Sequence, residues 1–172
     1  MSSASTPAKP VVGLIMTGGG ARAAYQVGVM RALHDMLPQG VSNPFPIICG
    51  TSAGAINAAV LATDANNFRR GVRRLMMVWK NFHVDQVYRA DTLGALANSA
   101  RWLFMALSGG RLNDPVSLLD NSPLARLLER HIDFAAIGRN IQAGHLDAFA
   151  VTCSGYTSGQ SVTFYEGHAR HA

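Results

Sequence analysis

The sequence of 172 residues is short of charge, of cysteine and of long apolar runs. Charged residues make up 15% of the chain, and no run of lysine and arginine resembles a nucleic-acid-binding arm, so we expect no nucleic-acid partner. Cys49 and Cys153 lack the spacing of a metal site, and their apolar neighbours predict buried, free thiols and no metal ion. No apolar run approaches the roughly 20 residues of a membrane-spanning helix, and residues 1–10 lack the apolar core of a signal peptide. We therefore expect a cytoplasmic protein.

The sequence does contain enough apolar residues for one domain with a substantial core. Hydrophobic residues make up 48% of the chain, and its length suits one domain better than two. We expect residues 1–10, which are small and polar, to be a disordered tail and residues 11–172 to form the domain. The formal net charge of +5 mildly favours anionic partners such as an acidic lipid surface.

The N-terminal third alternates between strand and helix patterns. Val11–Met16 is a continuous apolar run, typical of a strand that is buried on both faces of a parallel sheet. Helical spacing follows, with one apolar face made by Tyr25, Val29, Leu33 and Leu37 and with Met30 beside them. A second apolar strand ends at Cys49, and Ala55–Leu61 predicts a buried helix. This order predicts an α/β fold with a mainly parallel central sheet.

The rest of the chain predicts four more helices and a hairpin. We expect helices near residues 68–79, 93–107, 122–131 and 134–141, and paired strands at 146–153 and 161–165. The first of these helices carries arginines opposite its apolar face, namely Arg69, Arg70, Arg73 and Arg74. A solvated basic face is favoured there over a membrane-docking face. For the second helix, core packing is favoured over an apolar flap that touches lipid.

The pattern Gly50-Thr51-Ser52-Ala53-Gly54 lies between a predicted strand and a predicted helix. In that context Gly-x-Ser-x-Gly is typical of a nucleophile elbow, a sharp turn that exposes a strained serine at the end of a strand. Gly50 and Gly54 are needed because side chains there would collide with the neighbouring strand and helix. The helix start would direct backbone N–H groups toward the negative charge of acyl transfer. Ser52 is thus a candidate nucleophile, and the alternative is a helix start that merely packs closely against a sheet.

A triple glycine, Gly18-Gly19-Gly20, follows the first predicted strand. Such a loop lets the backbone approach an anion and leaves N–H groups free to receive it. One interpretation is an oxyanion hole, and the other is a dinucleotide-binding fingerprint that ends at Ala23. The fingerprint needs an acidic residue at the end of the next strand, where this sequence has Cys49 followed by the Gly-Thr-Ser turn. The oxyanion hole is therefore favoured over a nucleotide-binding domain.

Together, the two motifs resemble those of the patatin-like phospholipases, lipid acyl hydrolases that use a Ser-Asp dyad. The resemblance is carried by residues 18–29 and 50–58, and it extends over nearly all of the chain after residue 10. It implies a three-layer α/β sandwich, with Ser52 as the nucleophile and no cofactor. It also implies that the N–H groups of Gly18, Gly19 and Gly20 form the oxyanion hole, with Arg22 supporting the loop. The implied substrate is a phospholipid or lysophospholipid, met at a peripheral membrane surface.

One part of the family pattern is missing. The family's catalytic aspartate lies in an Asp-Gly-Gly or Asp-Gly-Ala turn, and no aspartate of this sequence is followed by glycine. We therefore expect the chain to be the N-terminal part of a longer domain, truncated at its C-terminus and with little esterase activity alone. The alternative is a non-catalytic module that binds lipid or a partner. A histidine triad is not favoured, because nothing in the sequence places His131, His145 or His168 beside Ser52.

Overall fold

A computed structural model describes residues 11–81, 122–155 and 158–168 of the chain. These residues belong to two compact units, of which the larger comprises the chain up to Trp79 and from Ile132 onward. The described part of the smaller unit includes α5 (Ser122–His131), the helix predicted for 122–131. The tail predicted for residues 1–10 and the helix predicted for residues 93–107 lie outside the described residues.

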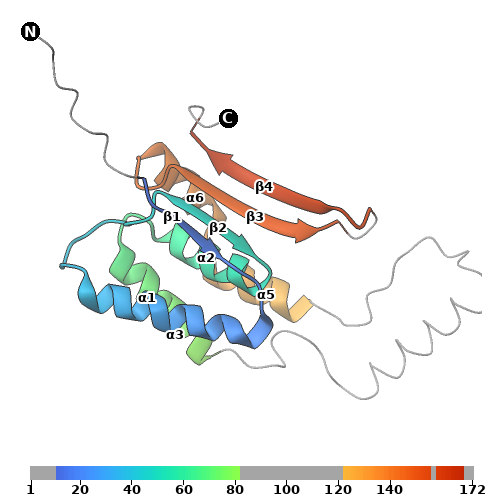
Figure 1. The fold of residues 1–172 in the computed structure, drawn as a ribbon, viewed down its shortest axis with the longest axis horizontal. Helices are drawn as coiled ribbons and strands as arrows, with labels where there is room; N and C mark the ends of the chain where they lie inside the picture. Colours follow the sequence, from blue (N-terminus) through green and yellow to red (C-terminus); the bar gives the residue numbers. More distant parts are fainter. Residues whose placement is uncertain (1–10, 82–121, 156–157, 169–172) are drawn as a thin grey trace, which may run out of the picture. The chain divides into compact units, whose positions relative to one another are not determined.

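The larger unit is built on a four-stranded sheet (Figure 1). Its strands follow the order of the chain, β1 (Gly13–Met16), β2 (Ile47–Thr51), β3 (Ala148–Ser154) and β4 (Ser161–Gly167). The first three strands are parallel, and β4 is antiparallel to β3. The predicted α/β fold, its mainly parallel sheet and the C-terminal hairpin are therefore confirmed.

Five helical segments accompany the sheet, η1 (Gly20–Ala23), α1 (Ala24–Met36), α2 (Ala53–Thr63), α3 (Phe68–Lys80) and α6 (Phe134–Gln142). α2 is the central helix of the unit, because it contacts β1, β2 and β3 as well as α6 (Figure 1). Its small and apolar side chains permit this, and eight of its eleven residues are buried. The buried helix predicted from Ala55–Leu61 is therefore confirmed.

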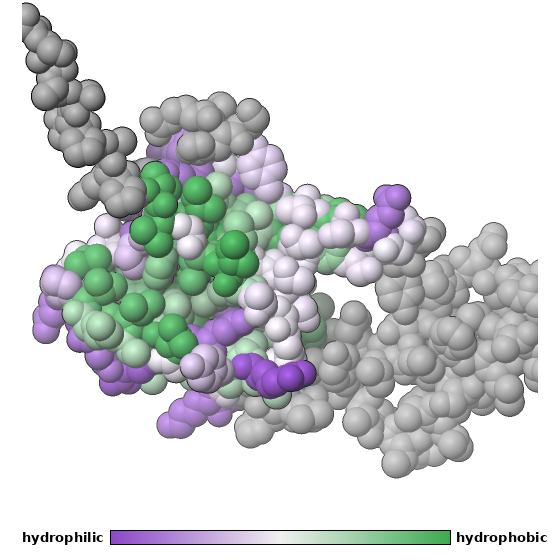
Figure 2. Space-filling model, in the orientation of Figure 1, coloured by the Kyte–Doolittle hydropathy of each residue, from purple (hydrophilic) through white to green (hydrophobic). Residues whose placement is uncertain are grey.

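Only one face of the sheet is covered by the described helices. Met16, Ile48 and Phe149 lie on that face and are between 0% and 8% exposed. Ile15 points to the other face and is 76% exposed, and Figure 2 shows hydrophobic side chains gathered over β1, β2 and α1. The prediction that Val11–Met16 is buried on both faces is wrong for the described part of the chain, since no described helix covers the second face.

The inward face of α1 agrees with the prediction only in part. Met30 is buried as expected, and Leu33 and Leu37 are half-buried. Tyr25 is 80% exposed and Val29 is 41% exposed, while Val27 and His34 are buried instead. α1 follows directly on η1, whose last residue, Ala23, is buried against α2. The start of α1 is thus attached to α2 by a polar contact, which apolar periodicity alone does not report.

The two cysteines are free thiols, as predicted, but their predicted burial is only partly correct. Cys49 is half-buried, and Cys153 is exposed. β3 runs beyond the end of β2, so that among the described strands Cys153 pairs only with β4, opposite Val162. The apolar neighbours of Cys153 in the sequence could not show that its strand projects past the helix-covered part of the sheet.

The start of α6 provides a test of the pH dependence of stability. Arg139 bonds to the Asp133 carboxylate at 2.7 Å, and the N–H of Ala136 donates to it at 3.1 Å. These bonds hold the pKa of Asp133 below its ordinary value of 3.8. A lowered pKa stabilises the fold above pH 3.8, and this contribution disappears as the pH falls through the folded-state pKa. We expect Asp133→Ala to lower the thermal midpoint at pH 7 by a few degrees, with a smaller difference at pH 3. Glu129→Ala, which removes another exposed carboxylate, is the control.

Candidate active site

Ser52 occupies the turn between β2 and α2. β2 ends at Thr51 and α2 begins at Ala53, so that Ser52 alone forms the junction. Its φ is 54° and its ψ is −129°, and within the described chain it is the one non-glycine residue with a positive φ. Such a conformation costs about 1–3 kcal/mol and persists only where the surrounding structure enforces it. The side chain is exposed, so the hydroxyl is open to solvent at the end of the strand.

Two glycines flank this turn at places where no side chain fits. A Cβ atom on Gly50 would lie 2.6 Å from Cα of Ala55, and one on Gly54 would overlap the carbonyl oxygens of Met16 and Thr17. Gly50 therefore lets α2 start directly beside β2, and Gly54 lets the first turn of α2 touch the end of β1. The helix start and the ends of two strands are thereby brought together at Ser52.

The glycine loop lies directly beside the serine. A Cβ atom on Gly18 would be 3.0 Å from Cβ of Ser52 and 3.7 Å from its Oγ. Gly19 has a φ of 152° and Gly20 a φ of 56°, conformations that side chains other than hydrogen rarely allow. The two sequence motifs, more than thirty residues apart, thus meet in one exposed place.

Arg22 lies at the end of this loop. Its backbone N–H donates to the carbonyl of Gly19 at 3.2 Å and closes the turn. Its side chain is exposed, and the structure gives the guanidinium no hydrogen bond or ion pair to a described residue. The contact that Arg22 makes with the loop is therefore a backbone contact.

The surroundings of Ser52 favour negative charge. The first N–H groups of a helix have no acceptor within the helix, and those of Ala53 and Gly54 begin α2 beside the serine. The N–H of Ala55 already donates to the carbonyl of Ser52 at 2.9 Å. The positive end of the α2 dipole adds to these donors. The start of α2 therefore offers backbone donors and a positive dipole end at Ser52, and the glycine loop lies beside the same residue.

The described aspartates are engaged elsewhere. Asp35 is bonded to Arg31 and Asp64 to Arg70, while Asp133 caps α6. Asp147 directly precedes β3, at the N-terminal ends of the parallel strands, whereas Ser52 lies at their C-terminal ends. The remaining four aspartates lie outside the described residues. No described aspartate is therefore placed as a partner of Ser52.

Two of the candidate histidines, His145 and His168, are not brought to Ser52 either. His145 precedes β3, and the N–H of His168 donates to the carbonyl of Asp147. Both histidines therefore lie at the N-terminal ends of the parallel strands, away from Ser52. His131 ends α5 in the smaller unit. The described part of the chain therefore gives no support to a histidine triad.

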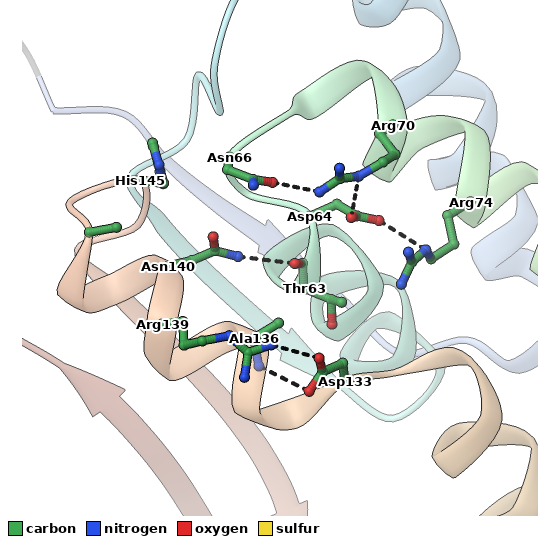
Figure 3. Close-up of a pocket in the computed structure, with 11 residues that line it drawn as sticks. Thr63, Asp64, Asn66, Arg70, Arg74, Asp133, Ala136, Arg139, Asn140 and His145 are labelled. Atoms are coloured by element: carbon green, nitrogen blue, oxygen red, sulfur yellow. Dashed lines mark hydrogen bonds and ion pairs between the residues drawn. The ribbon is translucent and has the colours of Figure 1, made fainter.

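A cavity of about 600 Å³ lies at the far end of α2 from Ser52 (Figure 3). Figure 3 shows Arg70 and Arg74 directed at Asp64, at 2.6 and 2.9 Å, and Arg139 directed at Asp133. Asp64 is 2% exposed, so these arginines compensate a buried charge. The arginine side of α3, predicted to be a solvated face, is thus partly engaged in the fold. The aspartates and arginines that line the cavity thus form structural ion pairs, and no activated nucleophile is found among the lining residues.

The strain at Ser52 gives a prediction for stability. We expect Ser52→Gly to raise the thermal midpoint by roughly 2–4 °C, because glycine adopts this conformation without the steric cost that serine bears. Ser52→Ala keeps a Cβ atom and should leave the midpoint within about 1 °C of the wild type. Thermal unfolding followed by circular dichroism measures both. A Ser52→Gly midpoint at or below that of Ser52→Ala would show that the turn is not strained.

Three side chains behind the glycine loop were missed by the sequence analysis, namely Gln26, Asn57 and Trp79. They form hydrogen bonds to one another and to the backbone at both ends of the loop. The available signal was Asn57, a single polar residue in the otherwise small and apolar stretch of α2. A buried polar side chain needs partners, and its position in the elbow helix indicated that they would lie near the site.

A cluster of metal ligands and a membrane-spanning helix are both absent from the described residues. Among them, no group of three histidine, cysteine, aspartate or glutamate side chains could hold a metal ion. None of the described helices has the length and apolar character to cross a membrane.

Comparison with known proteins gives a family match and several curated relatives. A family model described as patatin-like phospholipase matches residues 14–163. Relatives named lysophospholipase NTE1 include those of Aspergillus terreus, Aspergillus oryzae and Chaetomium globosum, which are 33%, 31% and 30% identical over 109 residues. Each of these alignments covers 60% of this chain but only 7% of the relative. No solved structure gives a significant match.

Proposed function

Because the chain belongs to the patatin-like phospholipase family, we propose that it is the part of a serine lipid acyl hydrolase that supplies the nucleophile and the oxyanion hole. The nucleophile is Ser52, and the donors are the N–H groups of Gly18, Gly19 and Gly20 together with the start of α2. The observation that carries the proposal is the contact between Gly18 and the strained, exposed Ser52. A glycine loop that merely packs on a helix would not require a serine in that conformation.

The proposed reaction has two steps. Oγ of Ser52 attacks the carbonyl carbon of a fatty-acid ester, and the loop N–H groups stabilise the negative oxygen of the tetrahedral intermediate. The carbon–oxygen bond to the alcohol then breaks, the alcohol leaves with the proton that the serine has lost, and an acyl-enzyme remains. Water hydrolyses this ester, releases the fatty acid and restores Ser52.

The proposed substrate is a phospholipid or a lysophospholipid. The support is the family description and the printed name of the fungal relatives, lysophospholipase. A cytoplasmic protein that meets such lipids at a membrane surface would suit the net positive charge. The exposed position of Ser52 allows an ester carbonyl in a bilayer or micelle to reach it.

The base of the proposed dyad is an aspartate in an Asp-Gly turn, which is absent from the 172 residues. The described aspartates have other positions and partners. This observation favours a second candidate function, a non-catalytic module that keeps the fold and binds lipid without cleaving it. The two candidates differ in whether Ser52 reacts covalently.

A fluorophosphonate probe tests the proposal, because it phosphonylates serines that are activated by an oxyanion hole even where the base is weak. We expect mass spectrometry to find the adduct on the peptide that contains Ser52, and on no other serine. Phosphatidylcholine or lysophosphatidylcholine vesicles should slow the labelling by competition. Vesicle binding without any adduct on Ser52 would favour the binding module instead.

A further inference from the structure

A chain of hydrogen bonds runs from α3 through α2 to the glycine loop. The indole N–H of Trp79 donates to Oδ1 of Asn57 at 2.7 Å, and Nδ2 of Asn57 donates to Oε1 of Gln26 at 3.0 Å. Nε2 of Gln26 then donates to the carbonyl of Thr17 at 2.8 Å. The second N–H of Asn57 reaches the carbonyl of Ala23 at 3.1 Å. Asn57 is fully buried, and its bond to Ala23 is shielded from water, whereas the bond from Gln26 to Thr17 is exposed.

The chemistry of the groups fixes the direction of this chain. An indole N–H can only donate, so the Asn57 atom facing Trp79 must be its oxygen, and the amide NH₂ must face the loop. A backbone carbonyl can only accept, so Gln26 must turn its NH₂ toward Thr17 and its oxygen toward Asn57. Each amide therefore has one possible orientation, and the hydrogen bonds hold the loop in a single arrangement.

The two carbonyls at the end of this chain lie on either side of the glycine loop. Thr17 immediately precedes Gly18, and Ala23 ends the 3-10 turn that follows it. Asn57 lies in α2, five residues after Ser52. Through this one side chain, both ends of the loop are attached to the helix that begins at the nucleophile.

We propose that Asn57 is a positioning residue, which acts through Gln26 to hold the N–H groups of Gly18–Gly20 at the oxyanion position beside Ser52. Glycine backbone has no side chain to anchor it, and a displacement of about 1 Å can reduce a rate by roughly 100-fold. The proposal rests on the proposed function, because it assigns a purpose to the loop geometry that acyl transfer would need.

The protein contains a second buried asparagine that serves as a matched control for Asn57. Asn140 is also a buried asparagine whose amide N–H groups bond to two carbonyls, those of Ala62 and Thr63, at 2.9 and 3.0 Å. It binds the opposite end of the same helix, α2, away from Ser52. Loss of Asn140 removes two amide N–H bonds, as does loss of Asn57, which also loses the bond from Trp79. Of the two asparagines, Asn57 is the one attached to the glycine loop.

The experiment measures the second-order rate constant of fluorophosphonate labelling and the ³¹P NMR shift of the adduct in the 172-residue chain. We expect Asn57→Ala and Gln26→Met to slow labelling by about 10- to 100-fold and to change the ³¹P shift, which reports donors to the phosphonyl oxygen. We expect Asn140→Ala to lower the thermal midpoint without changing either value. If Asn57→Ala fails to fold, Gln26→Met decides, because Gln26 is only half-buried.

Wild-type rates and shifts in both loop variants, or equal losses in Asn140→Ala, would overturn the proposal. A wild-type protein that never labels would contradict the proposed function instead. In that case, hydrogen exchange at the amides of residues 18–22 decides between the outcomes. Faster exchange in Gln26→Met than in Asn140→Ala supports the positioning role, and equal exchange contradicts it.

Discussion

Ser52→Ala should abolish covalent labelling by a fluorophosphonate, with a rate at least 1000-fold below that of the wild type. The physical reason is that alanine offers no oxygen to attack phosphorus, while no other hydroxyl-bearing residue in the described part of the chain lies in such a strained turn. Time courses of probe incorporation, read by intact-protein mass spectrometry, measure the difference. Removal of one member of a catalytic unit commonly has effects of this size or larger.

Ser154→Ala is the matched control for this experiment. Ser154 is also exposed and also ends a strand of the same sheet, but it lies in ordinary extended pairing with Ser161. Its loss should leave the labelling rate unchanged. Labelling that survives in Ser52→Ala, or that disappears in Ser154→Ala, would place the reactive residue elsewhere.

Gly54→Ala should destabilise the fold by about 3 kcal/mol or more and lower the thermal midpoint by roughly 6–12 °C. The added methyl group would overlap the carbonyl oxygens of Met16 and Thr17, which are backbone atoms and cannot rotate aside. α2 and the end of β1 must therefore separate, and Thr17 and Gly18 must move with β1. We expect labelling of Ser52 to fall in parallel, even at temperatures where the variant remains folded.

Gly28→Ala is the control, because the same methyl group is added to a helix where nothing lies within 4 Å of it. Alanine should stabilise α1 by about 0.5–1 kcal/mol, since it restricts the unfolded chain. Chemical denaturation of both variants gives the comparison. Equal stability of Gly54→Ala and wild type would mean that α2 does not contact β1 as the structure describes.

Local patterns in the sequence predicted most of the described elements. The apolar run of α2, the spacing in α3 and the turn before β4 each depend on residues that are neighbours in the chain. The exposure of Ile15 and Cys153 could not be predicted in this way. It depends on which helices cover the sheet and on how far β3 extends past β2, and both are properties of the assembled unit.

The residues of the candidate site also divide into those that local sequence patterns predict and those that depend on the assembled fold. Ser52 and the glycine loop could be found because each is part of a local motif with a backbone requirement of its own. The Gln26–Asn57–Trp79 chain could not, because Asn57 is separated from its two partners by 31 and 22 residues. These contacts lie at the start of α1, where the apolar periodicity placed the exposed Tyr25 on the buried face.

A crystal structure of the phosphonylated protein would show whether Ser52 and the glycine loop act together on an acyl group. We expect phosphorus bonded to Oγ of Ser52, with the phosphonyl oxygen about 2.7–3.1 Å from backbone nitrogens of Gly18–Gly20 or Ala53. Gln26 and Asn57 should keep the bonds that they make in the free protein. A phosphonyl oxygen directed into solvent, with the glycine loop making no contact to it, would contradict the account.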